Sequence, residues 1–291
     1  MEPRIDARTG LAALIGDPVE HSLSPLIHNT AFRAAGLNHV YLALRVDRAE
    51  VEAAVRGMRA LGFLGASVTA PHKQAVIPVL DEMTLQASDV GAVNTIVRRG
   101  TRLIGDNTDV AGFLEPLNPL ADELHGGRML VIGAGGAARA VVYALLTTFQ
   151  PERLTLAART PTRAERLADD LAPFDKHGAL EVRPSGQLHE AARRARLIVN
   201  ATPLGTHPKI EDTPLPDMDA LGPEHIVYDL VYNPETTRLL RDAASRGART
   251  IGGLEMLIAQ AAAAFVQWTG TEMPLEAVRK ALRNRPLQSY G

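Results

Sequence analysis

A glycine-rich turn between an apolar strand and a helix constrains the fold of this chain more than any other feature. Gly133, Gly135 and Ala138 follow a short apolar run with the spacing G-x-G-x-x-A, and residues 137–147 resemble an Ala-rich helix. In such a turn the first glycine allows a sharp bend, the second lets a phosphate approach the backbone, and the small third residue permits close helix packing. A second strand follows at 154–158. This context favours a dinucleotide-binding βαβ unit over a purely structural turn.

Runs typical of strands alternate with runs typical of helices through most of the sequence. Strand-like runs lie at 11–15, 40–46, 66–69, 92–97, 102–104, 129–132, 154–158, 197–200 and 226–230. Helix-like runs lie at 24–35, 49–61, 137–147, 161–171 and 254–268. The alternation predicts an α/β protein with two domains, an N-terminal α/β domain with a mostly parallel sheet and a Rossmann-like dinucleotide-binding domain. We expect the first at 1–109 and 253–291, and the second at 110–252.

Composition excludes several classes of protein. The chain has 291 residues, no cysteine and a formal net charge of −2, so thiol chemistry is absent and no basic face for nucleic acid is indicated. The longest apolar stretch, 256–268, is shorter than the roughly 20 residues of a membrane span. The apolar run near the N-terminus is too short for the core of a signal peptide. We therefore expect a cytoplasmic enzyme without nucleic-acid or membrane partners.

The residues after the second strand of the βαβ unit bear on the choice of dinucleotide. An NAD site usually places an acidic residue there, which binds the ribose 2′-hydroxyl. Here Ala158 is followed by Arg159 and, one helical turn later, by Arg163. A guanidinium pairs with phosphate through a planar fork, so this pattern favours NADP. The alternative is that both arginines are ordinary surface residues.

Polar clusters in the first domain stand where strands are expected to end. Ser22 and Ser24 precede Pro25 at a helix start, where they could hold a carboxylate, although Ser24 could also simply cap the helix. Lys73 is expected one turn into a short helix that begins at Pro71. Asp109 closes a polar run and could itself cap the next helix. A dehydrogenase needs a proton donor beside the reacting carbonyl, and a lysine held by a carboxylate can supply it.

Together these stretches resemble the shikimate dehydrogenase family over nearly the whole chain. The resemblance is carried by ordered motifs at 16–25, 68–73, 91–95, 105–109, 133–138, 200–203 and 254–261. It implies reversible reduction of 3-dehydroshikimate to shikimate with NADPH, a step of chorismate and aromatic amino acid biosynthesis. It also implies that 1–109 and 253–291 bind the substrate, while 110–252 binds NADP.

The resemblance also assigns roles to single residues. Lys73 and Asp109 would be the catalytic pair. The substrate carboxylate would be held by Ser22 and Ser24, and the ring substituents would be contacted by Thr69, Asn94, Tyr232 and Gln260. The cofactor would be bound by Gly133, Ala134, Gly135, Gly136, Ala137, Arg159, Thr160, Arg163, Asn200, Ala201, Thr202 and Gly253.

The chain departs from the family pattern at a few positions, and other functions stay open. Ser67 and Ala158 stand where Asn is frequent, His72 where a bulky apolar residue is common, and Val110 where Gly is common. Alternatives are a quinate/shikimate dehydrogenase with relaxed use of NAD and NADP, and a non-catalytic nucleotide-sensing module. We expect no metal site. The sequence leaves the oligomeric state open, and a homodimer is compatible with it.

Overall fold

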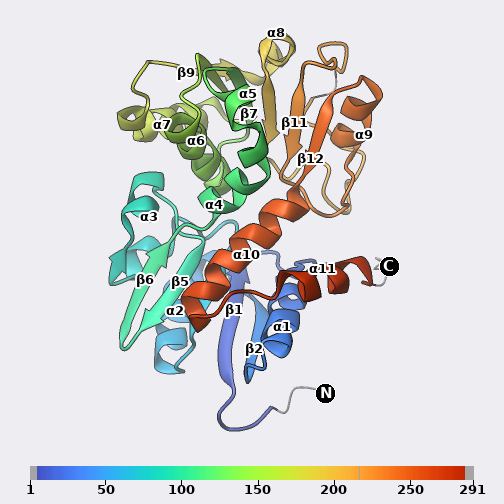
Figure 1. Cartoon of the computed structure of the whole chain (residues 1–291). Helices are drawn as coiled ribbons and strands as arrows, with labels where there is room; N and C mark the ends of the chain where they lie inside the picture. Colours follow the sequence, from blue (N-terminus) through green and yellow to red (C-terminus); the bar gives the residue numbers. More distant parts are fainter. Residues whose placement is uncertain (1–4, 216, 286–291) are drawn as a thin grey trace. The chain divides into compact units, whose positions relative to one another are not determined.

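The computed structural model describes residues 5–215 and 217–285, and it divides into two compact units (Figure 1). The first unit holds the described residues of Met1–Ser88, Ala92–Thr108 and Gln260–Gly291. The second unit holds those of Asp89–Gly91 and Asp109–Ala259. Each unit is built around its own sheet, and the α/β architecture predicted from the sequence is confirmed.

The first unit contains a six-stranded sheet in the order β2-β1-β3-β5-β6-β4. Its strands are β1 (Gly10–Gly16), β2 (His39–Arg45), β3 (Gly65–Val68), β4 (Glu82–Met83), β5 (Thr95–Arg99) and β6 (Arg102–Asp106). Strand β1 is parallel to β2 and β3, whereas β5 is antiparallel to β3 and β6. The carboxyl ends of β1, β3 and β6 therefore meet the start of β5 at one edge of the sheet.

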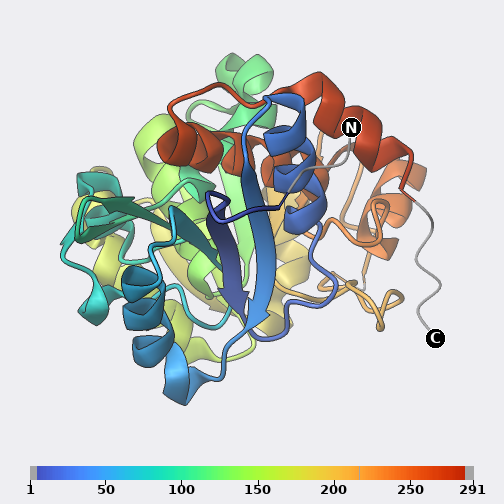
Figure 2. The ribbon, with the colours of Figure 1, turned by 90° about the horizontal axis from the view of Figure 1, so that it is seen from below.

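Helices and apolar side chains cover this sheet. The helices are α1 (Ser24–Ala34), α2 (Val51–Ala60), α3 (Leu85–Val90) as far as Ser88, α10 (Gly253–Thr269) from Gln260 onward, and α11 (Leu275–Arg283), with short 3-10 turns at Arg48–Glu50 and Ile77–Val79. Figure 2 shows β1 and β2 side by side, with α1 next to them. The core includes Ile15, Val55, Phe63, Val68 and Ile96, all nearly inaccessible to solvent. This apolar core fixes the loops at the strand ends.

The second unit contains a parallel six-stranded sheet in the order β12-β11-β10-β7-β8-β9. Its strands are β7 (Arg128–Ile132), β8 (Arg153–Ala158), β9 (Leu180–Pro184), β10 (Leu197–Asn200), β11 (Ile226–Asp229) and β12 (Arg249–Gly252). The order reverses direction between β7 and β10. At such a point the loops after two adjacent strands diverge, and open α/β sheets bind ligands there.

Helices connect these parallel strands. They are α4 (Asp109–Leu114), α5 (Ala121–Leu124), α6 (Gly136–Thr148), α7 (Pro161–Leu171), α8 (Leu188–Arg194) and α9 (Arg238–Ser245), with 3-10 turns at Glu115–Leu120, Ala172–Phe174 and Ser185–Gln187. Right-handed crossovers put α6 and α7 on one face of the sheet and α8 and α9 on the other. Leu130, Ile198 and Val227 from three neighbouring strands lie in one buried cluster under α8 and α9.

The short helix expected at Pro71 is absent, and that prediction was wrong. Residues 70–76 form turns, followed by the 3-10 turn at Ile77–Val79. The carbonyl of Lys73 accepts a hydrogen bond from the Val93 N–H (2.8 Å) rather than from a residue of its own segment. Pro78 lacks an N–H group and cannot extend a helix. Lys73 is thereby held against the segment that enters β5.

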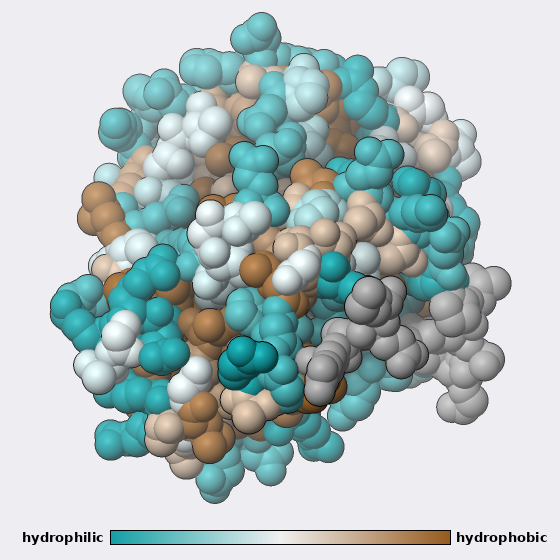
Figure 3. Space-filling view, turned by 60° about the horizontal axis from the view of Figure 1, so that its bottom comes forward, coloured by the Kyte–Doolittle hydropathy of each residue, from teal (hydrophilic) through white to brown (hydrophobic). Residues whose placement is uncertain are grey.

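The described surface is mostly polar. In the face drawn in Figure 3, hydrophilic side chains predominate and apolar ones lie between them in small groups. Large apolar side chains that are exposed include Ile5, Leu61 and Leu85, which are far apart in the sequence. Among the described helices, none combines the length and the apolar character needed to cross a lipid bilayer.

Candidate active site and cofactor site

The turn after β7 has a backbone that only glycine adopts easily. Gly133 has a φ of 127°, and a Cβ there would lie 2.7 Å from the carbonyl oxygen of Ala201. The Ala201 N–H in turn donates to Ile132 (2.8 Å), so the loops after β7 and β10 touch at the switch point. Gly135, by contrast, faces open space and leads into α6. Its N-terminal N–H groups, with the helix dipole, suit a phosphate.

Among the described residues of the second unit, most arginines form ion pairs, whereas the two arginines that follow β8 do not. Among its described residues, ion pairs are formed by arginines 128, 139, 153, 183, 193, 194, 196, 238, 241, 246 and 249. Within the same described ranges no ion pair involves Arg159 or Arg163, and both are exposed. Arg163 lies in the first turn of α7, where its N–H donates to Thr160 (3.1 Å). Two guanidiniums without acidic partners fit an anionic group such as the 2′-phosphate of NADP.

The loops after β10 and β11 share one buried polar network. Asn200 donates from Nδ2 to the Asp229 carboxylate (2.8 Å), and its Oδ1 accepts from the N–H and the hydroxyl of Thr202 (3.0 and 2.7 Å). Asp229 also accepts from the Val231 N–H (3.0 Å) and the Thr237 hydroxyl (2.6 Å). Burial raises the pKa of the Asp229 carboxyl, and these hydrogen bonds act in the opposite direction. The network fixes both loops.

Gly253 stands where the chain leaves β12 for α10. A Cβ at this position would lie 2.2 Å from the carbonyl oxygen of Leu230 and 2.8 Å from that of Val231. Both oxygens belong to the backbone and cannot move aside as a flexible side chain would. The close approach of the two segments therefore requires glycine. Tyr232, a predicted substrate contact, follows in the same loop and is half-buried.

In the first unit, backbone hydrogen bonds bring three predicted site residues to one edge of the sheet. Thr69 follows β3, and its N–H donates to Ile15 at the end of β1 (2.9 Å). The carbonyl of Asn94 accepts from the Val68 N–H (2.7 Å), which places Asn94 beside Thr69. Lys73 is next to them through its bond to Val93. Strand ends of this kind are where polar groups for a ligand gather in α/β folds.

The two serines at the start of α1 do not form a helix cap. Ser24 is itself the first residue of α1, is 5% exposed, and makes no cap; Leu23 occupies the N-cap position. Ser22 accepts the Ser24 N–H through its hydroxyl oxygen (3.2 Å). The alternative interpretation, that the Ser24 side chain caps the helix, is therefore wrong. Both residues still lie at a helix N-terminus, with a hydroxyl on each.

Asn94 takes part in a buried cluster with the end of β6. Its Oδ1 accepts from the Thr108 N–H (2.7 Å), and its Nδ2 donates to the Thr108 hydroxyl (3.0 Å). Thr95 donates to the same Oδ1 (3.0 Å). Asp109, the next residue, is buried and begins α4 in the second unit, whereas Lys73 and the buried Gln260 belong to the first. The two predicted catalytic residues are thus carried by different units.

His72 supplies a contact that the sequence did not reveal. Its ring is fully buried, and its Nε2–H donates to the carbonyl of Val46, just after β2 (2.6 Å). Its own N–H donates to Thr69 (2.9 Å). The ring thereby ties the Lys73 segment to the end of a neighbouring strand. An apolar residue at this position would fill the space but could not form this hydrogen bond.

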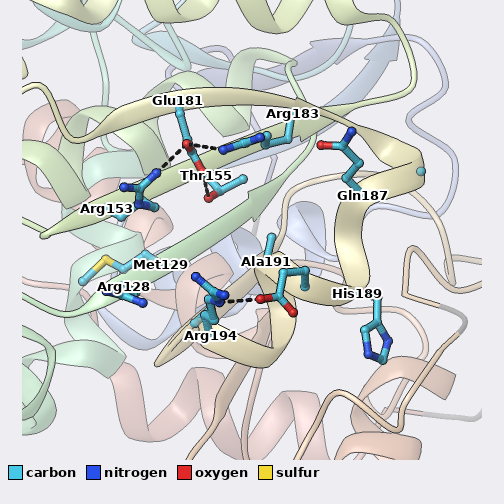
Figure 4. A pocket seen from close by; sticks show the side chains of 13 residues that line it. Arg128, Met129, Arg153, Thr155, Glu181, Arg183, Gln187, His189, Ala191 and Arg194 are labelled. Carbon is cyan, nitrogen blue, oxygen red and sulfur yellow. Dashed lines mark hydrogen bonds and ion pairs between the residues drawn. The ribbon is translucent and has the colours of Figure 1, made fainter.

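A separate pocket of about 490 Å³ lies at the start of β7 and β8 and beside β9 and α8 (Figure 4). Arg153 and Arg183 line it, and both pair with Glu181 (2.7 and 3.0 Å). Arg194, on its other side, pairs with Glu190 (2.5 Å). Because these charges are already compensated, the pocket offers no strong attraction for an anion. It contains none of the predicted site residues.

Models of known families match three parts of the chain. The substrate-binding domain of shikimate dehydrogenase matches residues 14–96, and a shikimate/quinate 5-dehydrogenase model matches 117–220. The C-terminal domain of shikimate 5′-dehydrogenase matches 253–283. The matched segments include the glycine turn after β7 and the loops at the edge of the first sheet.

Individual proteins match over almost the full length. The NADP⁺-dependent shikimate dehydrogenase of Salinibacter ruber is 59% identical over 281 residues, which cover 96% of this chain and 99% of that protein. A shikimate dehydrogenase crystallised with NADP⁺ is 38% identical, covers 96% of both chains and has a TM-score of 0.89. The Thermus thermophilus enzyme in complex with NADP(H) and shikimate is 38% identical, with 94% and 98% of the chains covered and a TM-score of 0.82. On this identity and this shared architecture, the chain belongs to the shikimate dehydrogenase family.

Proposed function

We propose that this chain catalyses the reversible, NADP-dependent reduction of 3-dehydroshikimate to shikimate, a step of aromatic amino acid biosynthesis. The observation that carries the proposal is the 59% identity to an NADP⁺-dependent shikimate dehydrogenase over 96% of the chain. Two solved relatives hold NADP, and one of them also holds shikimate. The chain is accordingly an oxidoreductase, and a small hydroxylated carboxylic acid is its substrate. A homodimeric assembly and a cytoplasmic location stay predictions.

The second unit has the features that an NADP site requires. The close backbone at Gly133 and the start of α6 suit the pyrophosphate, and Arg159, Thr160 and Arg163 would hold the adenosine phosphate. The remaining cofactor contacts would come from Ala134, Gly135, Gly136, Ala137, Asn200, Ala201, Thr202 and Gly253. The nicotinamide ring of bound NADPH supplies the hydride. We assign 110–252 to cofactor binding, and 1–109 with 253–291 to substrate binding and catalysis.

Substrate binding is assigned to groups at the edge of the first sheet and to one loop of the second unit. Ser22 and Ser24 would bind the carboxylate, because a hydroxyl on each lies at a helix N-terminus, where the dipole favours an anion. Thr69, Asn94, Tyr232 and Gln260 would contact the ring hydroxyls. Lys73 would donate the proton to the carbonyl oxygen, directly or through a water that it orients. Asp109 would hold the lysine ammonium and accept a hydrogen bond from a substrate hydroxyl.

Steady-state kinetics of the purified chain tests this assignment. Wild-type protein is given shikimate or quinate, each with NADP or NAD, and turnover is expected to be fastest with shikimate and NADP. Lys73→Ala should lower kcat by about 10²–10⁴, the usual contribution of a general acid, while the Kd for NADP is unchanged. A kcat within a few-fold of wild type would show that Lys73 has another role. Wild-type protein without turnover on shikimate would overturn the proposed function itself.

A further inference from the structure

Asp229, at the end of β11, is a buried carboxylate that none of the site assignments above includes. It is inaccessible to solvent, and it accepts hydrogen bonds from Asn200, Val231 and Thr237 at 2.6 to 3.0 Å. These three donors are neutral, and no cation of the described residues forms an ion pair with it. A buried carboxylate costs free energy unless each oxygen is hydrogen-bonded. Its presence at the carboxyl end of an interior strand of the parallel sheet therefore calls for a role.

The first consequence of this carboxylate is the orientation of the Asn200 side chain. An ionised carboxylate only accepts hydrogen bonds, so Asn200 must turn its Nδ2 toward Asp229. The Oδ1 of Asn200 is then directed to Thr202, where it accepts from both the N–H and the hydroxyl (3.0 and 2.7 Å). One carboxylate thus sets the conformation of the loop after β10, in which Asn200, Ala201 and Thr202 are assigned to the cofactor.

The second consequence concerns the loop after β11. The Asp229 oxygen that accepts from Asn200, Oδ1, also accepts from the N–H of Val231, two residues along the chain (3.0 Å). The carbonyl of Val231 accepts from the N–H of Gly253 (3.3 Å), and Tyr232 follows directly. The carboxylate therefore fixes the segments that carry Tyr232 and Gly253. Two neighbouring loops, both assigned to ligand contacts, depend on a single group.

We propose that Asp229 is a positioning residue, which holds the loops after β10 and β11 in the geometry needed for turnover. The inference rests on the proposed function of Asn200, Thr202 and Tyr232. Asp229 touches none of the reacting atoms. Its effect passes through the Asn200 amide and the Val231 N–H. Loss of the carboxylate should therefore reduce the rate of the bound complex more than it reduces the affinity for NADP, which the unaltered arginines after β8 continue to bind.

Asp229→Leu, which keeps the approximate shape of the side chain but has no acceptor, and Thr237→Val provide a matched comparison. Thr237 is the N-cap of α9 and accepts the Leu240 N–H (3.3 Å), so its loss removes a helix cap and one contact to Asp229. The contacts of Asp229 to Asn200 and Val231 stay intact in Thr237→Val. Both variants should lower Tm. Only Asp229→Leu should lower kcat, because only it removes the Oδ1 acceptor that Asn200 and Val231 share.

The measurements are kcat and KM with shikimate and NADP, the Kd for NADP by calorimetry, and Tm. We expect kcat of Asp229→Leu to fall about 10- to 100-fold, the equivalent of one hydrogen bond to a charged group, with less than a threefold change in Kd. Thr237→Val should keep kcat within threefold. Asp229→Ala, which is smaller and also lacks an acceptor, replaces Asp229→Leu if that variant does not fold, with the same split expected.

Three results would overturn the inference. One is a kcat for the Asp229 variant within threefold of wild type, and another is a Kd for NADP that weakens as much as kcat falls. The third is an equal loss of kcat in Thr237→Val, because activity would then follow stability alone. Wild-type protein without turnover on shikimate would instead refute the proposed function, so the two failures are distinguishable.

Discussion

His28 makes the stability of the first unit depend on pH in a way that can be calculated. The imidazole is inaccessible to solvent and stacks on Tyr41, with ring centroids 4.3 Å apart. Trp268 lies 5.1 Å away, and neither ring nitrogen of His28 has a hydrogen-bond partner among the described residues. Burial in this aromatic cluster lowers the pKa of His28 from 6.5 to about 3. The folded chain therefore holds the neutral imidazole, which carries no charge to desolvate.

The sign and size of the effect follow from proton linkage. Between the two pKa values the unfolded chain binds a proton at His28 and the folded chain does not, so acid favours unfolding. Stability from this group is fully present above pH 6.5 and is lost as the pH falls toward 3. Between pH 7 and pH 5, with an unfolded pKa of 6.5, the loss is about 2 kcal/mol.

Urea unfolding at pH 7 and pH 5 measures this loss, with the fluorescence of Trp268 as the signal. Trp268 is the single tryptophan of the chain and belongs to the same cluster. The variant His28→Leu has an apolar side chain of similar size, and all other titrating groups are shared. The free energy of unfolding of wild type should therefore fall about 2 kcal/mol further than that of His28→Leu between the two pH values. An equal pH dependence in both proteins would refute the assigned burial and pKa of His28.

Two further predictions concern single hydroxyls. Ser24→Ala should raise KM for shikimate by about tenfold or more, since a hydrogen bond to a charged group contributes about 1.5–3 kcal/mol; the Kd for NADP, measured in parallel, should stay constant, and a matching rise in that Kd would contradict the assignment. The Tyr228 hydroxyl is buried and has no hydrogen-bond partner among the described residues, while its ring stacks on Phe113 (5.2 Å). Tyr228→Phe should therefore raise the free energy of unfolding by about 1 kcal/mol, and a loss of stability in urea would show that the hydroxyl is satisfied.

The parts of the fold that depend on local pattern could be predicted from the sequence. The helix at 161–171 and the strand at 197–200 occur with the predicted bounds. The helix has apolar residues at helical spacing, and the strand is a short continuous apolar run, so both are visible in the local sequence. Strands β9 and β12 were missed, because each is short, lies at an edge of the sheet and contains charged or polar residues between its apolar ones. Their strand conformation depends on pairing with neighbours distant in the sequence.

The candidate site was predicted largely through motifs, whereas its supporting contacts were not. Nothing in the sequence around Asp229 shows that Asn200 and Thr237 converge on it, because they come from three separate segments. His72 illustrates the same limit: its position in a motif was visible, but its bond to Val46 depends on the packing of β2 beside β1. The helix expected at Pro71 does not form: one local bond of helical type is present, from the Val76 N–H to His72 (3.1 Å), but the carbonyl of Lys73 accepts from Val93 instead of continuing that pattern.

The central claim, NADP-dependent catalysis, is tested most directly by one ratio. It is kcat/KM with NADP divided by kcat/KM with NAD, measured in wild type and in two variants. Arg159 and Arg163 follow β8 and form no ion pairs within the described residues, so they are available for a 2′-phosphate. The account predicts a ratio well above one for wild type with shikimate. In Arg159→Ala the KM for NADP should rise about ten- to hundredfold, with KM for NAD nearly unchanged. Ala158→Asp should lower the ratio further, because its carboxylate would repel the phosphate. A wild-type ratio near one, or a ratio that neither substitution alters, would contradict the account.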